Sequence, residues 1–543
     1  MVRPAIARST VAAALIVVAL GADPRQPSLS LFASELRPAS AQNGAVEAAF
    51  QRFFQAATAR DAAATVDAIA RVGVSFDEAY RRLKRGRTYA EAKTGQVWMT
   101  NRTSDEVEHR YAVNVPDSYD PARKYQVRVQ LHGGVMMRRS SVPPANAGGI
   151  GALGGADDQI YIVPFSWDAM PWWSDDQILN LREILDRAKR AYNVDENRIV
   201  LSGVSDGGTG AYYVAMRETT AFASVLPLNG FLMVLAAADI AANGPVYPNN
   251  LRDKPFFIVN GERDPLYPTR TVDPYVDHMK RGGVVLDYRP QAGAGHNTAW
   301  WPQVRDAYET FVREHPRNPL PDALTWETHD TRLQGRAHWL VIDTLGPAAG
   351  EAAPLADLNL FAGPPVADFG ARSVGVRITR VVPGSNADRM GLKAGDALLR
   401  LNDRTVHVDV EVAEVFDGLR PGSAITLLVV RDNLPVELEG KYEPQTVQPP
   451  PRELFDRSVP SGRVDLVRAG NTVTATTRGV TAFTLLLSPD QFDFSQPVKV
   501  VANGRTVFDG RVKKDLRTLL RYAAADNDRT MLFGAELRID LAK

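Results

Sequence analysis

The chain has 543 residues, of which 45% are hydrophobic and 23% charged, and this length predicts two to four globular domains. Lys and Arg together number 63, as do Asp and Glu, so neither a nucleic-acid-binding basic excess nor an acidic tail is present. The absence of cysteine excludes disulfides, thiolate catalysis and cysteine-ligated metal sites. We expect no metal and no other cofactor.

The N-terminus has the pattern of a secretion signal. Arginines precede an apolar run over residues 11–20, which is too short to span a bilayer. Small residues suited to cleavage follow at 19–21 and at 39–41. Residues 1–41 are therefore predicted to be a signal peptide, and we expect a periplasmic or extracellular protein with no membrane span after cleavage. An uncleaved anchor is the alternative.

Residues 42–100 form the next predicted unit, and most of it has helical periodicity. Phe50, Phe53 and Phe54 recur at three- and four-residue spacing, and residues 66–72 continue the pattern. This predicts a short helical segment ahead of the main domain. Its residues indicate no function.

Residues 101–318 alternate between strand-like and helical stretches. Continuous apolar strands separated by helices are typical of a mostly parallel sheet covered on both faces. This segment is therefore predicted to be a doubly wound α/β domain. The strand-like runs are residues 111–115, 126–131, 160–164, 199–201, 223–228, 255–261 and 284–288.

A serine stands at a predicted sharp turn between a strand and a helix. The turn is Gly203-Val204-Ser205-Asp206-Gly207, and the helical pattern begins near Thr209. Glycines permit the tight backbone that exposes such a serine. Its hydroxyl becomes a useful nucleophile when a histidine accepts its proton. Ser205 is the candidate nucleophile.

The candidate acid follows a later strand. Asp264 comes just after the strand-like run at 256–259, where side chains point into the crevice in which α/β sheets bind ligands. Asp264 precedes a proline, so it also has the pattern of a simple turn residue. Glu262 and Asp273 are the rival acids.

The candidate base is His296, which lies in a glycine-rich loop immediately after the strand-like run at 284–288. The glycines allow this loop to return over the sheet. His278 and His315 lie on predicted helices and are better explained as structural residues. The chain order serine, acid, histidine is the order of the α/β hydrolases.

Donors for an oxyanion are predicted from the end of an earlier strand. His132-Gly133-Gly134-Val135 follows an apolar run, as the H-G-G motif of esterases does. The donors would be the backbone N–H of Asp206 and that of Gly134 or Val135. A plain glycine-rich turn is the alternative.

These motifs together carry a resemblance. Residues 107–315 resemble the α/β-hydrolase superfamily, and most of all secreted carboxylesterases of the polyhydroxybutyrate-depolymerase and feruloyl-esterase kind. The resemblance implies a triad of Ser205, Asp264 and His296 acting through an acyl-enzyme. It does not specify the substrate, because this fold hosts esterases, peptidases, lipases and thioesterases.

Two tryptophan clusters follow strands of this domain. Trp167, Trp172 and Trp173 come after the strand at 160–164, and Trp300 and Trp301 come after the histidine loop. Trp172, Trp173 and Trp300 are predicted to bind substrate by stacking on an aromatic or sugar group. Packing that fixes the loops is the equal alternative.

Beyond residue 318 the pattern changes to β-strands and turns. Strand-like alternation recurs within residues 319–360 and again within residues 443–543, which begin with a Pro-rich linker at 444–451, and Asn503-Gly504 between two such runs signals a hairpin. A strand pair alone is too small to bury a core. We therefore predict one β-rich domain in two parts, with residues 361–442 inserted between them.

The inserted residues 361–442 carry the motif Gly391-Leu392-Lys393-Ala394-Gly395-Asp396 before an apolar strand. The segment resembles a bacterial PDZ domain, which implies capture of a peptide C-terminus. Phe369, Gly370 and Ala371 fall where the carboxylate-binding loop belongs, and residues 410–419 where the groove helix belongs. Because Ala371 and Arg372 depart from the usual hydrophobic pattern, a PDZ fold without peptide binding stays open.

The function predicted from the sequence is a secreted serine carboxylesterase whose PDZ domain docks a peptide or partner. A peptidase of the prolyl-oligopeptidase kind is the first alternative, although the stretch before residue 111 is too short for that family's propeller. A non-catalytic binding scaffold is the second. The expected partners are an ester of unspecified acyl group and a peptide C-terminus.

Overall fold

The computed structural model describes residues 39–103, 107–135, 158–237, 240, 242, 244–347, 355–407 and 419–541. Most of the predicted signal peptide, residues 1–38, lies outside these ranges. No helix in the described ranges is both long and apolar enough to cross a membrane.

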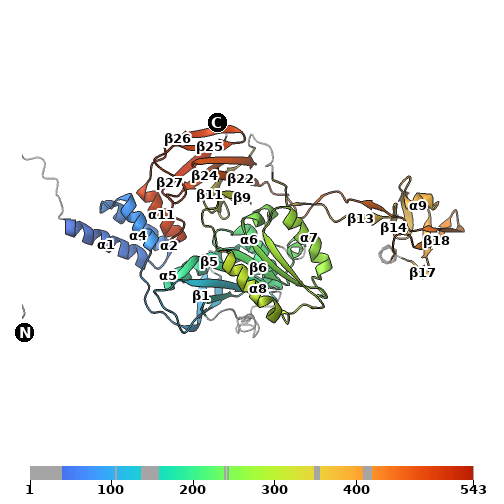
Figure 1. The fold of residues 1–543 in the computed structure, drawn as a ribbon, viewed down its shortest axis with the longest axis horizontal. Coiled ribbons are helices and arrows are strands. Elements are labelled where there is room, and N and C mark those ends of the chain that lie inside the picture. Colours follow the sequence, from blue (N-terminus) through green and yellow to red (C-terminus); the bar gives the residue numbers. More distant parts are fainter. Residues whose placement is uncertain are drawn as a thin grey trace, which may run out of the picture.

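The centre of the molecule is an eight-stranded sheet in the order β1-β2-β4-β3-β5-β6-β7-β8 (Figure 1). β2 pairs antiparallel with β1 and β4, and the other neighbours are parallel. The strands are β1 (Gly95–Arg102), β2 (Glu108–Val115), β3 (Tyr125–Leu131), β4 (Ile160–Pro164), β5 (Val194–Val204), β6 (Ser224–Leu228), β7 (Phe256–Gly261) and β8 (Leu286–Gln291).

Apolar residues on successive strand positions enter two cores, one on each face of the sheet. On β7, Phe256 and Ile258 join the cluster on one face, and Phe257 and Val259 join the cluster on the other, as the two-residue period of a strand requires. This explains the continuous apolar runs in the sequence. The helices that cover the sheet are α5 (Asp175–Ala191), α6 (Asp206–Arg217), α7 (Thr269–Arg281) and α8 (Trp301–Glu314), with 3₁₀ helices η1 (Leu232–Ala236) and η2 (Pro248–Asp253).

The C-terminal β-domain has a five-stranded sheet, β26-β25-β23-β22-β9, and a four-stranded sheet, β10-β11-β24-β27, around one core. β9 pairs with β22 and β11 with β24, so strands before residue 361 pair with strands after residue 442. The PDZ unit is therefore an insertion, as predicted. The strands are β9 (Ala323–Thr328), β10 (Arg336–Ala337), β11 (Leu340–Leu345), β22 (Gly462–Ala469), β23 (Thr472–Arg478), β24 (Val480–Leu487), β25 (Val498–Ala502), β26 (Arg505–Gly510) and β27 (Ala535–Asp540).

The N-terminal helices pack on a helix from the far end of the chain. α11 (Leu516–Asp526) buries Leu519, Leu520 and Ala523 against them. This helix was not predicted, because its neighbours in sequence have strand periodicity, although its own leucine and alanine spacing is helical. The N-terminal helices are α1 (Ala39–Gln55), α2 (Ala59–Ala64), α3 (Val66–Arg71) and α4 (Phe76–Arg85).

The inserted unit lies apart from the rest of the molecule, at the end of paired extended segments (Figure 1). The pairs are β12 (Leu360–Phe361) with β21 (Arg452–Glu453), and β13 (Val366–Asp368) with β20 (Gln445–Val447). The predicted groove helix lies almost entirely outside the described residues. The unit itself contains β14 (Ala371–Val374), β15 (Arg377–Val381), α9 (Asn386–Arg389), β16 (Ala397–Leu401), β17 (Arg404–Thr405), β18 (Ala424–Arg431) and β19 (Leu434–Lys441).

Candidate active site

Ser205 is the single residue between the end of β5 and the start of α6. Its φ of 58° and ψ of −121° place it in a sparsely populated backbone region, which is typical of a strained nucleophile turn. A Cβ at Gly203 would lie 2.0 Å from the carbonyl oxygen of Gly207, and a Cβ at Gly207 would lie 2.2 Å from that of Leu131. The flanking glycines are therefore required for α6 to begin this close to β3 and β5.

A hydrogen-bond chain connects three of the predicted residues. Nε2 of His296 lies 2.8 Å from Oγ of Ser205, and Nδ1 of His296 lies 2.7 Å from Oδ2 of Asp264. With the Nδ1 proton donated to the carboxylate, Nε2 is free to accept the proton of the serine hydroxyl. The fold thus brings together residues that lie 91 and 32 positions apart in the chain.

Asp264 is held so that one oxygen faces the histidine. Its side chain is fully buried, and Oδ1 accepts hydrogen bonds from the backbone N–H groups of Leu266 and Tyr267 at 2.8 and 3.0 Å. These amides stabilise the ionised carboxylate. The rival acids are engaged elsewhere, because Glu262 accepts from the Gly293 amide and Asp273 from the Tyr288 hydroxyl.

Hydrogen bonds from the ends of neighbouring strands hold the loop that carries His296. The side-chain amide of Asn229 donates to the carbonyl of Asn297 at 2.9 Å, and the Arg263 N–H donates to the carbonyl of Ala294 at 2.8 Å. Asn229 is buried and has a φ of +48°, a conformation that Asn tolerates better than most residues. The sequence analysis missed Asn229; an Asn-Gly pair directly after an apolar strand was the available signal.

The H-G-G turn lies directly against the serine turn. A Cβ at Gly133 would lie 3.0 Å from the Cβ of Ser205. His132 fixes the turn: Nε2 accepts from the Ser166 N–H at 3.1 Å, so Nδ1 carries the proton and donates to the carbonyl of Gly133 at 2.8 Å. Burial lowers the pKa of His132, which keeps the ring neutral in this structural role.

The oxyanion donors differ in part from the prediction. The N–H of Val135 donates to Oδ2 of Asp206 at 2.9 Å, so it is not free to bind a substrate oxygen. Within the described residues, the N–H groups of Gly134 and Asp206 have no acceptor. Gly134 has a φ of +70°, a conformation that favours glycine. Gly134 and Val135 were the predicted alternatives for the second oxyanion donor, and of these two the geometry leaves only the Gly134 N–H available.

The strand order, the antiparallel β2 and the serine turn after the fifth strand decide the fold. The fold is that of the α/β hydrolases. Within this chain, residues 355–441 match the family model of the PDZ domain, in agreement with the separate unit of strands β14–β19.

Several solved structures are similar to this chain at low identity. A thermostable esterase is 21% identical over 41% of this chain, with a TM-score of 0.33, and the chain spans 63% of that protein's length. A ferulic acid esterase is 20% identical over 40% of this chain and 98% of its own, with a TM-score of 0.30. An S-formylglutathione hydrolase of Staphylococcus aureus is 16% identical over 41% of this chain and 100% of its own, with a TM-score of 0.32. The fold assignment depends on the sheet and the serine turn themselves.

The predicted substrate-stacking tryptophans are buried, so that prediction is wrong for their rings. Trp172 and Trp173 are 0% and 1% exposed and Trp300 is 5% exposed. The indole N–H of Trp172 donates to the carbonyl of His132 at 2.8 Å, and that of Trp173 donates to the carbonyl of Ile240 at 3.1 Å. The Trp172 ring also packs edge-on against His132 at 5.1 Å, so it helps to fix the H-G-G turn, whereas Trp300 packs in the core on the other face of the sheet.

A row of aromatic rings leads away from the histidine instead. Tyr267 packs edge-on to His296 at 5.8 Å between ring centroids, and Phe231 lies 5.9 Å from Tyr267. Tyr275 on α7 lies 5.4 Å from Phe231 and stacks at 4.6 Å on Phe361, at the base of the PDZ unit. On this side, Tyr267 therefore lies against His296, and Phe231 lies against Tyr267.

The predicted carboxylate loop of the PDZ unit is partly engaged within the chain. The N–H of Gly370 donates to Oδ1 of Asp368 at 2.7 Å, and Arg372 pairs with the same carboxylate. Phe369 is buried and stacks on Tyr442 at 6.2 Å, and Ala371 begins the first strand of the unit. A peptide carboxylate at this loop would have to displace Asp368 from the Gly370 amide.

Proposed function

We propose that this protein is a secreted serine hydrolase that cleaves carboxylic esters through an acyl-enzyme on Ser205. The observation that carries the proposal is the continuous chain of hydrogen bonds from Asp264 through His296 to a serine in a strained turn. Such a chain activates a hydroxyl that is otherwise a weak nucleophile. A non-catalytic scaffold has no need of it.

In the first half of the reaction, Oγ of Ser205 forms a bond to the ester carbonyl carbon while its proton passes to Nε2 of His296. The carbonyl oxygen becomes an oxyanion that accepts hydrogen bonds from the N–H groups of Asp206 and Gly134, each worth about 3–4 kcal/mol of transition-state stabilisation. The bond to the alcohol oxygen then breaks, and that oxygen takes the proton from His296. The acyl group remains on Ser205.

In the second half, water attacks the acyl carbon and gives a proton to Nε2 of His296. The bond to Ser205 breaks, its oxygen regains the proton, and the carboxylic acid leaves. Throughout both halves Asp264 stabilises the imidazolium and keeps the ring in one orientation. Its full burial and its two backbone donors support this role.

Ester cleavage is favoured over peptide cleavage by the architecture. Ahead of β2 the described residues form α1–α4 and β1, in place of the propeller that the prolyl-oligopeptidase kind of peptidase carries. Two of the similar solved structures are also esterases by name, a thermostable esterase and a ferulic acid esterase. We further propose that the PDZ unit docks a partner and that residues 1–41 direct secretion.

A substrate panel tests the proposal. Purified protein is assayed with short acyl, feruloyl and S-acyl esters and with peptide anilides, beside Ser205→Ala. We expect ester turnover that the variant lacks. Anilide turnover exceeding ester turnover would replace the esterase with a peptidase, and activity retained in Ser205→Ala would exclude the proposed nucleophile.

A further inference from the structure

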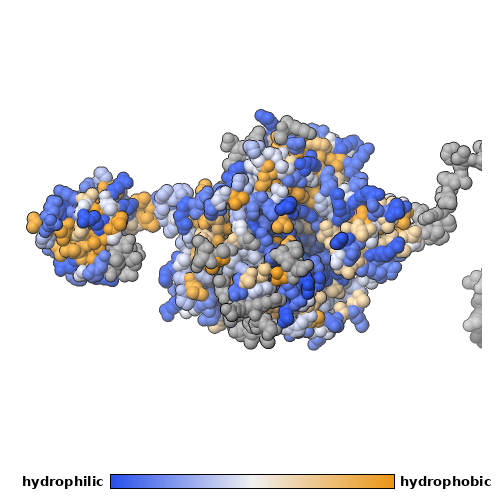
Figure 2. Space-filling model, turned by 180° about the vertical axis from the view of Figure 1, so that it is seen from behind, coloured by the Kyte–Doolittle hydropathy of each residue, from blue (hydrophilic) through white to orange (hydrophobic). Residues whose placement is uncertain are grey.

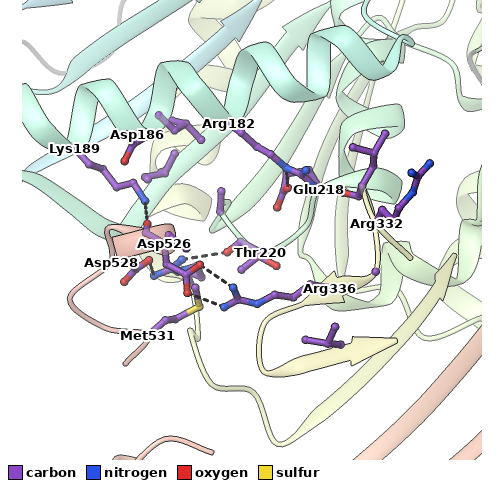
Figure 3. Close-up of a pocket in the computed structure, with 18 of the residues that line it drawn as sticks. Arg182, Asp186, Lys189, Glu218, Thr220, Arg332, Arg336, Asp526, Asp528 and Met531 are labelled. Carbon is purple, nitrogen blue, oxygen red and sulfur yellow. Dashed lines mark hydrogen bonds and ion pairs between the residues drawn. The ribbon is translucent and has the colours of Figure 1, made fainter. Parts of the chain in front are cut away.

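Charged side chains that pair with one another line the cavity between the α/β-hydrolase domain and the β-domain (Figure 3). Arg336 binds the carboxylate of Asp526, and Lys189 donates to the backbone carbonyl of the same residue. This cavity is therefore part of the joint between the two domains. The groups that recognise an ester lie at Ser205 instead, because the ester carbonyl has to reach Oγ of that residue.

The proposed reaction fixes which part of the ester lies beside His296. The alcohol oxygen takes its proton from Nε2, so it has to come within hydrogen-bond distance of that atom, about 2.6–3.2 Å. The carbonyl oxygen points instead to the N–H groups of Asp206 and Gly134. Side chains that pack against His296 therefore border the alcohol part of the ester.

An aromatic pair, Tyr267 and Phe231, lies at this position. Tyr267 is tilted by 74° to the imidazole ring of His296, with 5.8 Å between the ring centroids, and Phe231 is tilted by 43° to Tyr267 at 5.9 Å. The elements that build the triad also fix the pair. The N–H of Tyr267 donates to Oδ1 of Asp264 at 3.0 Å, and the N–H of Phe231 donates to Oγ1 of Thr209, on the helix that follows Ser205, at 3.4 Å.

The two rings leave apolar surface accessible beside the histidine. Phe231 and Tyr267 are each partly exposed, and Leu266, next to Tyr267 in the chain, is 59% exposed. Farther along the row, Phe361 is buried, with the guanidinium of Arg452 5.6 Å from its ring centroid. The end of the row at the histidine can therefore bind an apolar group of the alcohol, which would remove this surface from water.

The charges around Tyr267 favour a neutral group. Burial raises the pKa of Tyr267, and the negative charges of Asp206 and Asp264 raise it further, so the phenol stays uncharged. The same two carboxylates would repel an anionic alcohol. Both already accept hydrogen bonds within the chain, Asp206 from the Val135 N–H and Asp264 from His296, so neither needs a cationic ligand.

We propose that Phe231 and Tyr267 form the binding site for the alcohol part of the substrate, and that the substrate is an ester of a neutral, bulky apolar alcohol. This inference rests on the proposed function, because it depends on proton transfer from His296 to the leaving alcohol. The apolar group would cover both rings in the transition state and depart with the proton of Nε2. The acyl part, bound to Ser205, would not contact them.

A pair of reverse esters tests the assignment on the parent chain. Phenethyl acetate carries the apolar group on the alcohol side, and its isomer methyl hydrocinnamate carries it on the acyl side; ethyl acetate and methyl propanoate are the small references. We expect kcat/KM to rise at least about tenfold from ethyl acetate to phenethyl acetate, and to rise less from methyl propanoate to methyl hydrocinnamate. An equal or larger gain on the acyl side would overturn the assignment.

The charge of the alcohol is tested with acetylcholine and with neohexyl acetate, in which carbon replaces the ammonium nitrogen. We expect the neutral ester to have the higher kcat/KM, and a preference for acetylcholine would overturn the neutral alcohol in favour of a cationic one. Turnover of these esters with no gain from the phenethyl group would overturn this binding site alone. No turnover of any ester would overturn the proposed function as well.

A variant locates the binding site. Phe231→Ala is expected to lower the ratio of kcat/KM for phenethyl acetate to that for ethyl acetate several-fold, with circular dichroism as the folding control. Phe508→Ala, which removes a partly exposed ring on β26, is the matched control and should keep the ratio of the parent. An equal fall in both kcat/KM values would mean that Phe231 positions the histidine without binding the alcohol. The reverse esters decide the assignment even where Phe231→Ala fails to fold.

Discussion

The α/β-hydrolase domain carries two attachments that differ in how they are joined to it. The C-terminal β-domain meets it across buried ion pairs such as Arg317–Asp528, whose side chains are 1% and 3% exposed. The PDZ unit is reached through short strand pairs in which Val366 and Val447 face each other in register and are 48% and 37% exposed. The first joint is a buried interface, and we call the two domains that it joins the catalytic body, whereas the second leaves the PDZ unit as an appended module.

The PDZ unit also exposes apolar side chains. Figure 2 shows apolar residues over much of one face of the PDZ unit, and Val374 and Leu434 of this unit are 74% and 66% exposed. Exposed apolar surface of this kind often marks an interaction site. The comparison predicts that changes in the catalytic body affect catalysis or stability strongly, and that changes in the PDZ unit affect docking.

The largest effect is expected at the centre of the catalytic body. Ser205→Ala and His296→Ala should each lower kcat by about 10⁶, because these side chains act as one unit. The measurement is p-nitrophenyl acetate turnover, with circular dichroism as the folding control. More than a few per cent of the parent activity in either folded variant would exclude the assigned residue.

Asp264→Asn is expected to lower kcat by about 10⁴, since an amide in place of the carboxylate favours the wrong histidine tautomer. Glu262→Gln is the matched control: its amide oxygen still accepts from the Gly293 N–H, so its kcat should stay within a few-fold. Comparable losses in the two variants would indicate that Asp264 has no special role.

At the joint to the β-domain, Asp528→Asn should lower the free energy of unfolding by about 3–5 kcal/mol, because it leaves the Arg317 charge buried without a partner. Urea denaturation measures this, with exposed Asp509→Asn as the control expected near zero. A loss below about 1 kcal/mol would mean that the joint is not held by this pair.

The same variant has a predictable pH dependence. Burial favours the neutral acid, but the positive charges of Arg317 and Lys189 hold the pKa of Asp528 well below its usual value. The pair therefore contributes fully above the unfolded-state pKa of about 3.9, and its contribution is lost as the pH falls from there toward the lower folded pKa. The stability difference between parent and variant should shrink on acidification across that window.

A smaller effect is expected where the PDZ unit touches the catalytic body. Phe361→Ala removes the ring that stacks on Tyr275, and we expect kcat to fall several-fold because the aromatic row ends at His296. Phe361→Leu keeps apolar volume and should recover most of the loss. An unchanged kcat in Phe361→Ala would show that the row does not position the histidine.

The smallest effect is expected from removing the PDZ unit itself. Asp368 and Gln445 face each other in register, so residues 369–444 can be replaced by a two-residue turn that keeps Phe361 in place. Small-ester turnover should stay within about twofold of the parent. A tenfold fall in kcat would mean that the PDZ unit belongs to the catalytic body after all.

The motifs predicted the parts of the fold that depend on local chemistry. The serine turn, the glycine-rich histidine loop and the apolar strands each have local requirements that the sequence displays, and the sheet then brings Ser205, Asp264 and His296 together. The insertion was also predicted, because strands too few to form a core must pair elsewhere.

Features that depend on distant packing were not predicted. The burial of Trp172 depends on Gly210, where a Cβ would lie 2.3 Å from the Cβ of Trp172, and no pattern near the tryptophan reveals that. The Val135 N–H is unavailable as an oxyanion donor because it binds the side chain of Asp206, which lies 71 positions away in the chain. Likewise α11 finds its partners at the opposite end of the chain.

The central claim, that Ser205 is an activated nucleophile, is tested most directly by labelling the intact protein with a fluorophosphonate. Mass spectrometry of the digest should show one adduct, on the peptide that contains Ser205, and none in His296→Ala over the same time. Folded protein that stays unlabelled, or that is labelled at another residue, would contradict the account.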